Sequence, residues 1–252
     1  MIVFLTSSPS GPLDQSRFVD GLDQMNHFVD NLKENWKECA KCLMITASPD
    51  AYEQNDEMTA FFAHALEKAG LHFSEFLLWD GRDEIMSKEE LETYDVIFLG
   101  GGHVPTQNRF FEEIGLREKM QDFQGIVIGI SAGTMNSADV VYAQPELPGE
   151  SVDPNYVKYL KGLNLTKVQI LPHYQMVKDF ELDGRRLYED ITFGDSYGNR
   201  YLVLPDGSYL MKKDGVETVW GEAWWLSDGE MKKICENGEV KQVSGELESI
   251  QR

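Results

Sequence analysis

The sequence predicts an α/β fold with a doubly wound, mostly parallel sheet, and three observations support this class. Short apolar runs alternate with amphipathic segments through the first half of the chain. The alternation repeats several times, which is the sequence form of a parallel sheet covered by helices on both faces. Hydrophobic residues make up 42% of the 252 residues, which is enough to build a sizeable core.

The expected elements of the first half follow one another in order. The strands are short apolar runs: Ile2–Leu5, Leu43–Ala47, Phe73–Trp79, Val96–Leu99 and Ile126–Ile128. The helices between them lie within Phe18–Asn35, Asp56–Ala69, Ser87–Leu91 and Pro105–Met120. Gly70 is the expected stop of the second helix, and Ser87 with Glu90 forms the capping pattern of the third.

The second half consists mainly of short β-like runs separated by turn signals. The runs are Val168–Leu171, Tyr201–Leu204, Ser208–Lys212, Glu217–Trp220, Ala223–Leu226 and Gly238–Val243. Pairs such as Asp206-Gly207 and Asn237-Gly238 indicate tight turns between them. Because the chain has no Pro/Ser-rich linker and no repeat, we expect a single domain over residues 1–252, with 201–252 as a β-rich, antiparallel C-terminal extension.

Charge and hydropathy exclude several classes of partner. The chain has 23 Lys and Arg against 43 Asp and Glu, a net charge of −20. Nucleic acids and anionic membranes require a basic surface, so we expect neither as a partner. Mean hydropathy is −0.37, and no apolar run approaches the ~18 residues that span a bilayer. The apolar start Met1–Thr6 lacks a basic segment and a cleavage site, which favours a first strand over a signal peptide.

Three cysteines are typical of a reducing compartment, so we expect a cytoplasmic protein. Cys39 and Cys42 have C-x-x-C spacing, whereas Cys235 stands alone. A four-cysteine zinc site within one chain is therefore excluded. The spacing resembles a redox motif, but the pair lies in a helix-to-strand passage, and we favour ordinary thiols.

The most informative motif is Gly129-Ile130-Ser131-Ala132-Gly133. It follows an apolar run and precedes small residues that can open a helix, which is the pattern of a nucleophile elbow. The turn is tight, and a Cβ on either flank would collide with the strand or the helix. Such a turn exposes the serine hydroxyl and leaves the next backbone N–H free to hold an oxyanion.

A serine nucleophile needs a general base, and His173 is the best candidate among five histidines. His27 and His64 fall inside expected helices, and His72 follows a helix stop. His173 instead follows a short strand and Pro172, and function collects at the carboxyl ends of strands in a doubly wound sheet. We therefore expect His173 and Ser131 at the same edge of the sheet.

Two further features complete a candidate site. Gly100-Gly101-Gly102 ends a strand, and consecutive glycines let backbone N–H groups approach a substrate closely. A carboxylate must orient His173, and spacing alone does not choose among the candidates, which are Asp206, Glu146, Asp179 and Asp183.

Four stretches together resemble the peptidase S51 family, which groups dipeptidase E-like enzymes with the more distant cyanophycinases. They are Val96–His103, Ile128–Gly133, Ile170–Tyr174 and Leu204–Gly207, in the order and separation of that family, and the resemblance runs from about residue 40 to 215. The resemblance implies a flavodoxin-like sheet related to class I glutamine amidotransferases. It also implies a serine exopeptidase that hydrolyses short peptides, with no cofactor or metal.

The resemblance further assigns roles to individual residues. It implies Ser131 as nucleophile, His173 as base and Asp206 as the orienting carboxylate, with Glu146 as the alternative. The amides that would form the oxyanion hole are those of Gly101, Gly102 and Ala132, and the substrate-binding candidates are Arg185, Arg186 and His103. The expected partner is a small peptide substrate, and a homodimer is left open.

One departure from the family concerns substrate specificity. Dipeptidase E holds the aspartyl side chain of its substrate with an arginine upstream of a second one. Aligning Arg186 with the second arginine places Asp183 at the position of the first. We therefore expect poor hydrolysis of Asp-X dipeptides, unless Arg185 substitutes from nearby. The alternatives to an exopeptidase are a non-catalytic binding protein on a hydrolase scaffold and an amidase or esterase that acts on non-peptide substrates.

Overall fold

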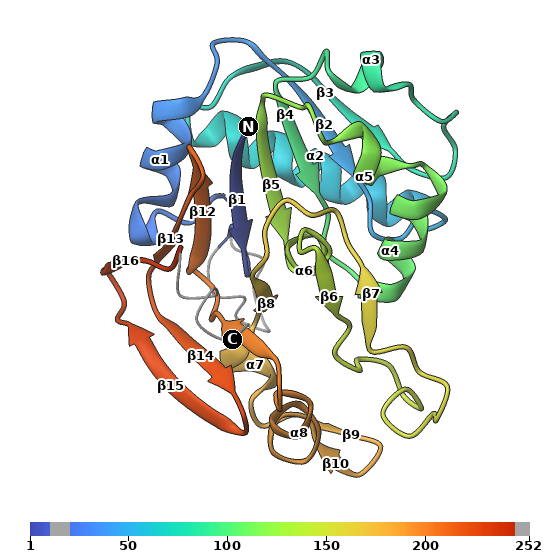
Figure 1. The fold of residues 1–252 in the computed structure, drawn as a ribbon. Coiled ribbons are helices and arrows are strands. Elements are labelled where there is room, and N and C mark those ends of the chain that lie inside the picture. The colour runs from blue at the N-terminus through green and yellow to red at the C-terminus, as the bar shows by residue number, and fades with distance from the viewer. Residues whose placement is uncertain (11–20, 245–252) are drawn as a thin grey trace.

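The computed structural model describes residues 1–10 and 21–244, and a large, mostly parallel sheet forms its centre (Figure 1). Five parallel strands lie in the order β3-β2-β4-β5-β1. Their bounds are β1 Ile2–Thr6, β2 Ala40–Ile45, β3 Phe73–Trp79, β4 Val96–Leu99 and β5 Ile126–Ile130. Beyond β1 the sheet continues with antiparallel strands β12 (Tyr209–Lys213), β13 (Val216–Trp220) and β16 (Val240–Gln242).

A second sheet has four strands in the order β15-β14-β11-β8. Their bounds are β8 Gln169–Leu171, β11 Arg200–Val203, β14 Ala223–Ser227 and β15 Glu230–Cys235. Strands β8 and β11 are parallel to each other. This pairing differs from the antiparallel arrangement that we expect for residues 201–252 from the sequence. Two small hairpin-like pairs complete the strands: β6 (Val140–Tyr142) with β7 (Tyr159–Lys161), and β9 (Glu181–Leu182) with β10 (Arg185–Arg186).

Helices cover both faces of the central sheet. The helices of the first half are α1 Phe28–Asn35, α2 Tyr52–Lys68, α3 Lys88–Leu91, α4 Val104–Glu113, α5 Leu116–Lys119 and α6 Ala132–Asn136. The second half adds α7 (Tyr174–Val177), the π-helical segment η2 (Leu187–Thr192) and α8 (Phe193–Asp195). The 3-10 turn η1 (Met25–His27) precedes α1.

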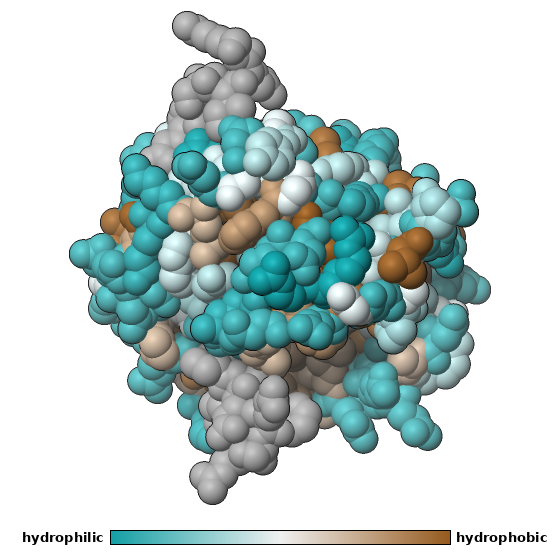
Figure 2. All heavy atoms as spheres, turned by 90° about the horizontal axis from the view of Figure 1, so that it is seen from below, coloured by the Kyte–Doolittle hydropathy of each residue, from teal (hydrophilic) through white to brown (hydrophobic). Residues whose placement is uncertain are grey.

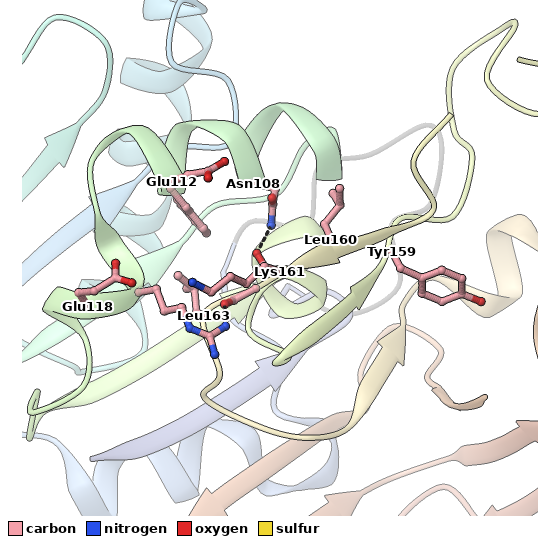
Figure 3. Close-up of a pocket in the computed structure, with 10 residues that line it drawn as sticks. Asn108, Glu112, Glu118, Tyr159, Leu160, Lys161 and Leu163 are labelled. Atoms are coloured by element: carbon pink, nitrogen blue, oxygen red, sulfur yellow. Dashed lines mark hydrogen bonds between the residues drawn. The ribbon is translucent and has the colours of Figure 1, made fainter. Parts of the chain in front are cut away.

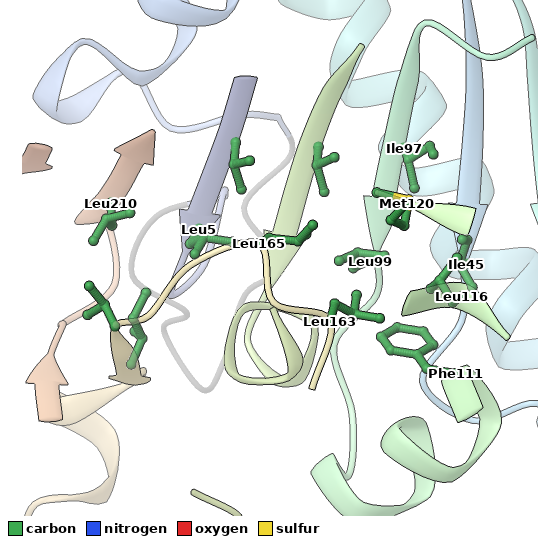
Figure 4. Packing of buried hydrophobic residues seen from close by; sticks show 14 of the residues in the cluster. Leu5, Ile45, Ile97, Leu99, Phe111, Leu116, Met120, Leu163, Leu165 and Leu210 are labelled. Carbon is green, nitrogen blue, oxygen red and sulfur yellow. The ribbon is translucent and has the colours of Figure 1, made fainter. Parts of the chain in front are cut away.

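Alternate residues of the central strands pack on opposite faces of the sheet, so the core consists of separate clusters on the two faces. In β1, Phe4 packs in the cluster that contains residues of α1 and α2, whereas Val3 and Leu5 pack in the cluster with α4 and α5. Figure 4 shows part of the cluster that contains residues of α4 and α5, where Leu99 of β4 lies near Leu163 and near Phe111 of α4. This alternation follows because successive side chains of a strand point to opposite faces.

The helix expected within Phe18–Asn35 is shorter than its apolar pattern suggests. Residues 11–20 lie outside the described residues, and α1 begins only at Phe28. Asn26 and His27 adopt φ values of 52° and 58°, which a right-handed helix cannot contain. The backbone of these two residues therefore delays the helix. By contrast, Ser87 forms a full capping box with Glu90 at α3.

The cysteines are unpaired in the structure. Cys39 is exposed, while Cys42 and Cys235 are buried, and all three are free thiols. Burial, with a smaller effect of the Asp95 charge, raises the pKa of Cys42 to about 12. A thiol with so high a pKa is a poor nucleophile, so the preference for ordinary thiols over a redox motif agrees with the geometry.

The outer surface is polar at the end of the molecule toward which β1 points. Seen from below, this face is mostly hydrophilic, with hydrophobic residues in small groups (Figures 1 and 2). Over the described parts of the chain, none of the helices has both the length and the apolar character needed to traverse a bilayer.

Candidate active site

Ser131 lies in a strained turn between β5 and α6. Its backbone has φ 50° and ψ −108°, a conformation that costs about 1–3 kcal/mol in a residue with a side chain. The glycines beside it are sterically required. A Cβ at Gly133 would lie 2.1 Å from the Leu99 carbonyl oxygen, and one at Gly129 would lie 2.9 Å from Thr134 Oγ1. The Gly-x-Ser-x-Gly spacing therefore reflects close packing of the turn against β4 and α6.

Ser131, His173 and Asp206 form a hydrogen-bonded chain. Ser131 Oγ lies 2.9 Å from His173 Nε2, and His173 Nδ1 lies 2.7 Å from Asp206 Oδ1. With the imidazole proton on Nδ1, the ring donates to the carboxylate and its Nε2 can accept the proton of the serine hydroxyl. This arrangement can convert the hydroxyl into a nucleophile.

The chain connects two sheets, which differs from the expectation that Ser131 and His173 end strands of the same sheet. Ser131 follows β5 of the central sheet, whereas His173 follows β8 and Asp206 follows β11 of the four-stranded sheet. Strands β8 and β11 are parallel neighbours, so their carboxyl ends bring His173 and Asp206 together. His173 itself has φ 58°, which turns the chain sharply into α7.

Asp206 is held as a carboxylate in a dry environment. Its side chain is 0% exposed. The Ser7 hydroxyl donates to Oδ1 at 2.6 Å, and Gln175 Nε2 donates to Oδ2 at 2.6 Å. Burial alone would raise the pKa of the Asp206 carboxyl, but the hydrogen bond and charge of His173 and the bonds from Ser7 and Gln175 outweigh it and hold the pKa below the ordinary value.

Ser7 and Gln175 are absent from the residues that the sequence patterns single out. Ser7 also accepts a hydrogen bond from the His173 backbone N–H at 2.7 Å, and Gln175 Oε1 accepts one from the Asp206 N–H at 3.0 Å. The available signal was position: Ser7 directly follows the first strand of a parallel sheet, where functional side chains gather. Gln175 belongs to none of the sequence motifs, so the sequence gives no signal that it contacts Asp206.

Glu146 does not contact His173 through any described hydrogen bond. Its backbone N–H donates to Glu150 Oε2, and its carboxyl stands near His173 and His103 without bonding either. Partial desolvation raises the pKa of the Glu146 carboxyl. The charge of His103 opposes this rise, the charge of Glu150 adds to it, and that of His173 opposes it. Of the two carboxylates that the family resemblance names, Asp206 is the one that bonds the imidazole.

The expected oxyanion-hole glycine lies against the serine. A Cβ at Gly101 would stand 3.4 Å from Ser131 Cβ, so the two residues are in contact. Among the described backbone hydrogen bonds, none uses the N–H of Gly101, Gly102 or Ala132 as donor. Gly102 has φ 154°, and a Cβ there would meet Ala47 Cβ at 2.7 Å.

The expected substrate-binding residues have other partners. Arg186 forms an ion pair with Asp190 at 2.7 Å, and Arg185 donates to the carbonyls of Ser151 and Asp190. Asp183 accepts hydrogen bonds from Gly149 N and from the Ser151 hydroxyl, at 2.8 and 2.7 Å, which tethers the loop after β6 to the β9–β10 turn.

His103 occupies the start of α4 and is also engaged. Its Nδ1 lies 2.8 Å from Thr106 Oγ1, and its Nε2 lies 2.8 Å from Glu150 Oε1. Glu150 in turn accepts the backbone N–H groups of Glu146 and Leu147. His103 therefore anchors the loop that carries Glu146 next to the proposed catalytic residues.

A cavity of about 490 Å³ opens beside Ser131. Ser131, His173, Gly101 and Gly102 contribute to its lining, as does one side of α2. Neither Arg185 nor Arg186 is part of this lining. The volume falls in the range of roughly 300–1,000 Å³ that is typical of small-ligand sites.

A separate cavity of about 340 Å³ lies between α4 and β7 (Figure 3). Glu112 and Lys161 line it, and Asn108 donates to the Lys161 carbonyl at 3.1 Å across one side. None of the sequence-predicted site residues belongs to its lining. Within the described parts of the chain, no group of three or more His, Cys, Asp or Glu residues could hold a metal ion.

A hydroxyl, an imidazole and a carboxylate are joined by hydrogen bonds beside a small-ligand cavity, an arrangement that is also found in serine hydrolases. Residues 16–217 match the model of peptidase family S51, so the chain belongs to this family and is a hydrolase of the serine peptidase class. A comparison with curated proteins finds no match.

Two solved structures are similar in fold. A peptidase from an acI-B1 actinobacterium superposes with a TM-score of 0.61 at 15% identity, and the match covers 96% of each chain. A provisional peptidase E protein from Listeria monocytogenes EGD-e superposes with a TM-score of 0.52 at 18% identity, covering 96% of this chain and 98% of the other.

Proposed function

We propose that this protein is a serine exopeptidase of the dipeptidase E type, which hydrolyses short peptides through Ser131, His173 and Asp206. The observation that carries the proposal is the pair of contacts from His173, at 2.9 Å to Ser131 Oγ and 2.7 Å to Asp206 Oδ1. Family membership and the cavity of about 490 Å³ support a small peptide as substrate. The order β3-β2-β4-β5 corresponds to the first four places of the 2-1-3-4-5 order of a flavodoxin-like sheet, which supports that fold. The fifth place is taken by β1, the first strand of the chain.

In the proposed reaction, Ser131 Oγ bonds to the carbonyl carbon of the scissile peptide while its proton passes to His173 Nε2. The carbonyl oxygen becomes an oxyanion, for which the amides of Gly101 and Ala132 are the proposed donors. His173 then gives the proton to the leaving amine as the C–N bond breaks, and Ser131 remains as an acyl ester. A water molecule attacks this ester, its proton goes to His173, and the acid product leaves as the Ser131 hydroxyl re-forms.

Asp206 has an electrostatic role in this scheme. Its ionised carboxyl holds the imidazole with the proton on Nδ1, and it stabilises the imidazolium that forms during both half-reactions. Ser7 and Gln175 would keep the carboxyl in place by occupying its remaining lone pairs. A separation of Ser131 and His173 beyond hydrogen-bond reach would have favoured a non-catalytic binding protein, and the contact of 2.9 Å does not supply that support. The unpaired thiols support a reducing, cytoplasmic setting.

The proposed function is tested by labelling with a fluorophosphonate probe, followed by mass-spectrometric mapping of the labelled residue. We expect a single labelled site at Ser131, and no labelling of Ser131→Ala. Digestion of a dipeptide library by the same preparation, followed by amino-acid analysis, tests the exopeptidase activity. Hydrolysis of simple esters without hydrolysis of any peptide would instead support an esterase.

A further inference from the structure

The helix α2 presents five residues to the cavity beside Ser131, and they lie on one helical face. The residues are Gln54, Glu57, Met58, Phe61 and Phe62. Their spacings of three, four, seven and eight place them side by side along the helix. Because α2 starts just beyond the carboxyl end of β2, its first turns stand nearest the sheet edge and the later turns lie deeper.

The polarity of this face changes with depth. Gln54 and Glu57 are exposed at the mouth of the cavity. Met58 and Phe61 are half-buried, and Phe62 is buried in the core cluster on this face of the sheet. Ile130, the residue before the nucleophile, adds another apolar side chain to the lining. The cavity therefore has an apolar floor and a polar rim.

The fixed charge in the described lining of the cavity is negative. Its described lining contains no lysine or arginine, and Glu57 is its single acidic residue. A substrate carboxylate in this space would lose water without gaining a permanently charged partner, because the basic group of the described lining is the His173 imidazole, and it would also approach the Glu57 carboxylate. An apolar side chain would instead exchange water for contacts with Met58, Phe61 and Ile130.

We propose that this cavity binds an uncharged apolar side chain of the peptide residue next to the scissile bond, and that Glu57 disfavours an acidic one. The proposal rests on the proposed function, because Ser131 and Gly101 share the lining of the cavity and define where the scissile carbonyl lies. The substrate class is thus short peptides with Leu, Met or Phe at one of the two positions that flank the cleaved bond.

The first experiment measures kcat/KM for two dipeptide series, X-Ala and Ala-X, where X is Leu, Met, Phe, Gly or Asp. In one series we expect Leu, Met and Phe to exceed Gly by roughly 10- to 100-fold, the gain for burying such a side chain. Asp should fall at or below Gly in that series. Equal rates for Gly and Leu in both series, or a preference for Asp in either, would overturn the proposal.

The second experiment uses the rim charge, which can be changed without disturbing the core. Glu57→Lys should raise the Asp/Leu ratio of kcat/KM in the selective series about 3- to 10-fold, because an attractive charge replaces a repulsive one at an exposed site. Glu53→Lys is the matched control, since Glu53 is an exposed residue of the same helix that does not line the cavity. The proposal is overturned if both variants move the ratio equally.

The third experiment separates this proposal from the proposed function. Calorimetry on Ser131→Ala measures dipeptide binding without turnover, and we expect Leu-containing dipeptides to bind at least tenfold more tightly than Gly-containing ones. Absence of probe labelling and of hydrolysis in the wild type would contradict the proposed function, while selective binding to Ser131→Ala would still support the apolar cavity. Non-selective or undetectable binding to a folded Ser131→Ala variant would overturn the cavity assignment.

Discussion

The backbone of Ser131 is held at φ 50° and ψ −108° by the packing around it, and this geometry directs the hydroxyl toward His173. Strain of this kind persists only where surrounding contacts impose it, and it is concentrated at functional sites. The hydroxyl itself makes few contacts that the fold requires. Removing it should therefore affect chemistry far more than stability.

We predict that Ser131→Ala abolishes peptide hydrolysis while the protein stays folded. Loss of a triad nucleophile typically removes about 10⁴–10⁶ of the rate. The measurement is kcat on a dipeptide that the wild type cleaves, together with the thermal midpoint of unfolding of both proteins. Retention of more than a tenth of the wild-type rate by pure mutant would mean that Ser131 is not the nucleophile.

His173→Ala should be as damaging as Ser131→Ala, and the double variant should be no worse than either. The reason is that nucleophile and base act in the same step, so that their losses do not add. Rate measurements on the two single variants and the double variant provide the test. Losses that multiply in the double variant would show that His173 does not serve as the base for Ser131.

The two acidic candidates can be compared directly by amide substitution. Asp206→Asn should lower kcat by about 10³–10⁴, because an amide donates to the imidazole and favours the wrong tautomer. Glu146→Gln should have an effect of less than about tenfold, since no described hydrogen bond joins Glu146 to His173. A larger loss from Glu146→Gln than from Asp206→Asn would reverse the assignment.

Residue chemistry in the sequence predicted that Ser131 and His173 lie together, and the structure places them within hydrogen-bond distance, but it did not predict the groups that hold them. Ser131 is marked by its glycines and His173 by its place after a strand. Asp206 was chosen over Glu146 only through resemblance, because a chain with 43 acidic residues offers many candidates. Ser7 could not be identified, since it lies 199 residues from Asp206 and a serine after a strand is common.

At the scale of elements, the elbow depends on close approach of α6 to β4. The Gly133 N–H donates to the Gly100 carbonyl at 3.1 Å, and the space where a Gly133 Cβ would lie is occupied by the Leu99 backbone. Flexible side chains cannot relieve such a contact, because the obstructing atoms belong to a buried strand. The glycine therefore fixes how close the helix and the strand can lie.

We predict that Gly133→Ala destabilises the protein by about 1–3 kcal/mol or more and removes most activity, since the turn must shift to admit the methyl group. Gly194→Ala in α8 is a matched control, because nothing lies within 4 Å of a Cβ there and its φ is not in the left-handed range. Urea unfolding and kcat of both variants provide the measurement. Equal stability of the two variants would contradict this account of the elbow.

Prediction of elements from the sequence succeeded where burial and period agree. Val96–Leu99 forms β4 with the predicted bounds, because a continuous apolar run between Asp95 and Gly100 leaves little choice. The strand β15, Glu230–Cys235, was missed because its pattern is mostly exposed and carries two lysines. The η2 segment was also missed, since π-helical backbone has no sequence period of its own.

At the scale of the whole molecule, pairings between distant strands determine the site. Strand β12 joins the central sheet beside β1, with Val3 opposite Lys212, and the second sheet carries His173 and Asp206. A single sequence contains no direct signal for which distant strands pair, because many apolar runs are equally good partners. The sequence therefore predicted that functional residues follow strands but not that they follow strands of two sheets.

The balance of charges on the whole molecule predicts how stability depends on pH. Asp80 has a side chain that is 0% exposed and pairs with Arg82 at 2.9 Å. Burial would raise its pKa, but the bonds from Arg82 and Asn55 and the charge of Arg82 hold the pKa of this carboxyl below its ordinary value. Asp206 behaves in the same way. Each depressed pKa stabilises the fold above the unfolded pKa of about 3.9, and this stability is lost as pH falls through the folded pKa.

We therefore predict a thermal midpoint that changes little between about pH 5 and 8 and falls steeply below about pH 4. The net charge of −20 acts in the opposite direction, because self-repulsion weakens as pH falls toward the pI of about 4.6. Repulsion between distant surface charges is screened beyond a Debye length of ~8 Å at 0.15 M salt, whereas the buried contacts of Asp80 and Asp206 are not, so the short-range contacts dominate in acid.

Melting curves from pH 3 to 8 test this balance. Asp80→Asn should lower the midpoint at pH 7 and flatten the acid limb, and Asp179→Asn, whose side chain is 85% exposed, should do neither. An unchanged midpoint for Asp80→Asn at pH 7 would show that the buried carboxylate contributes nothing to stability.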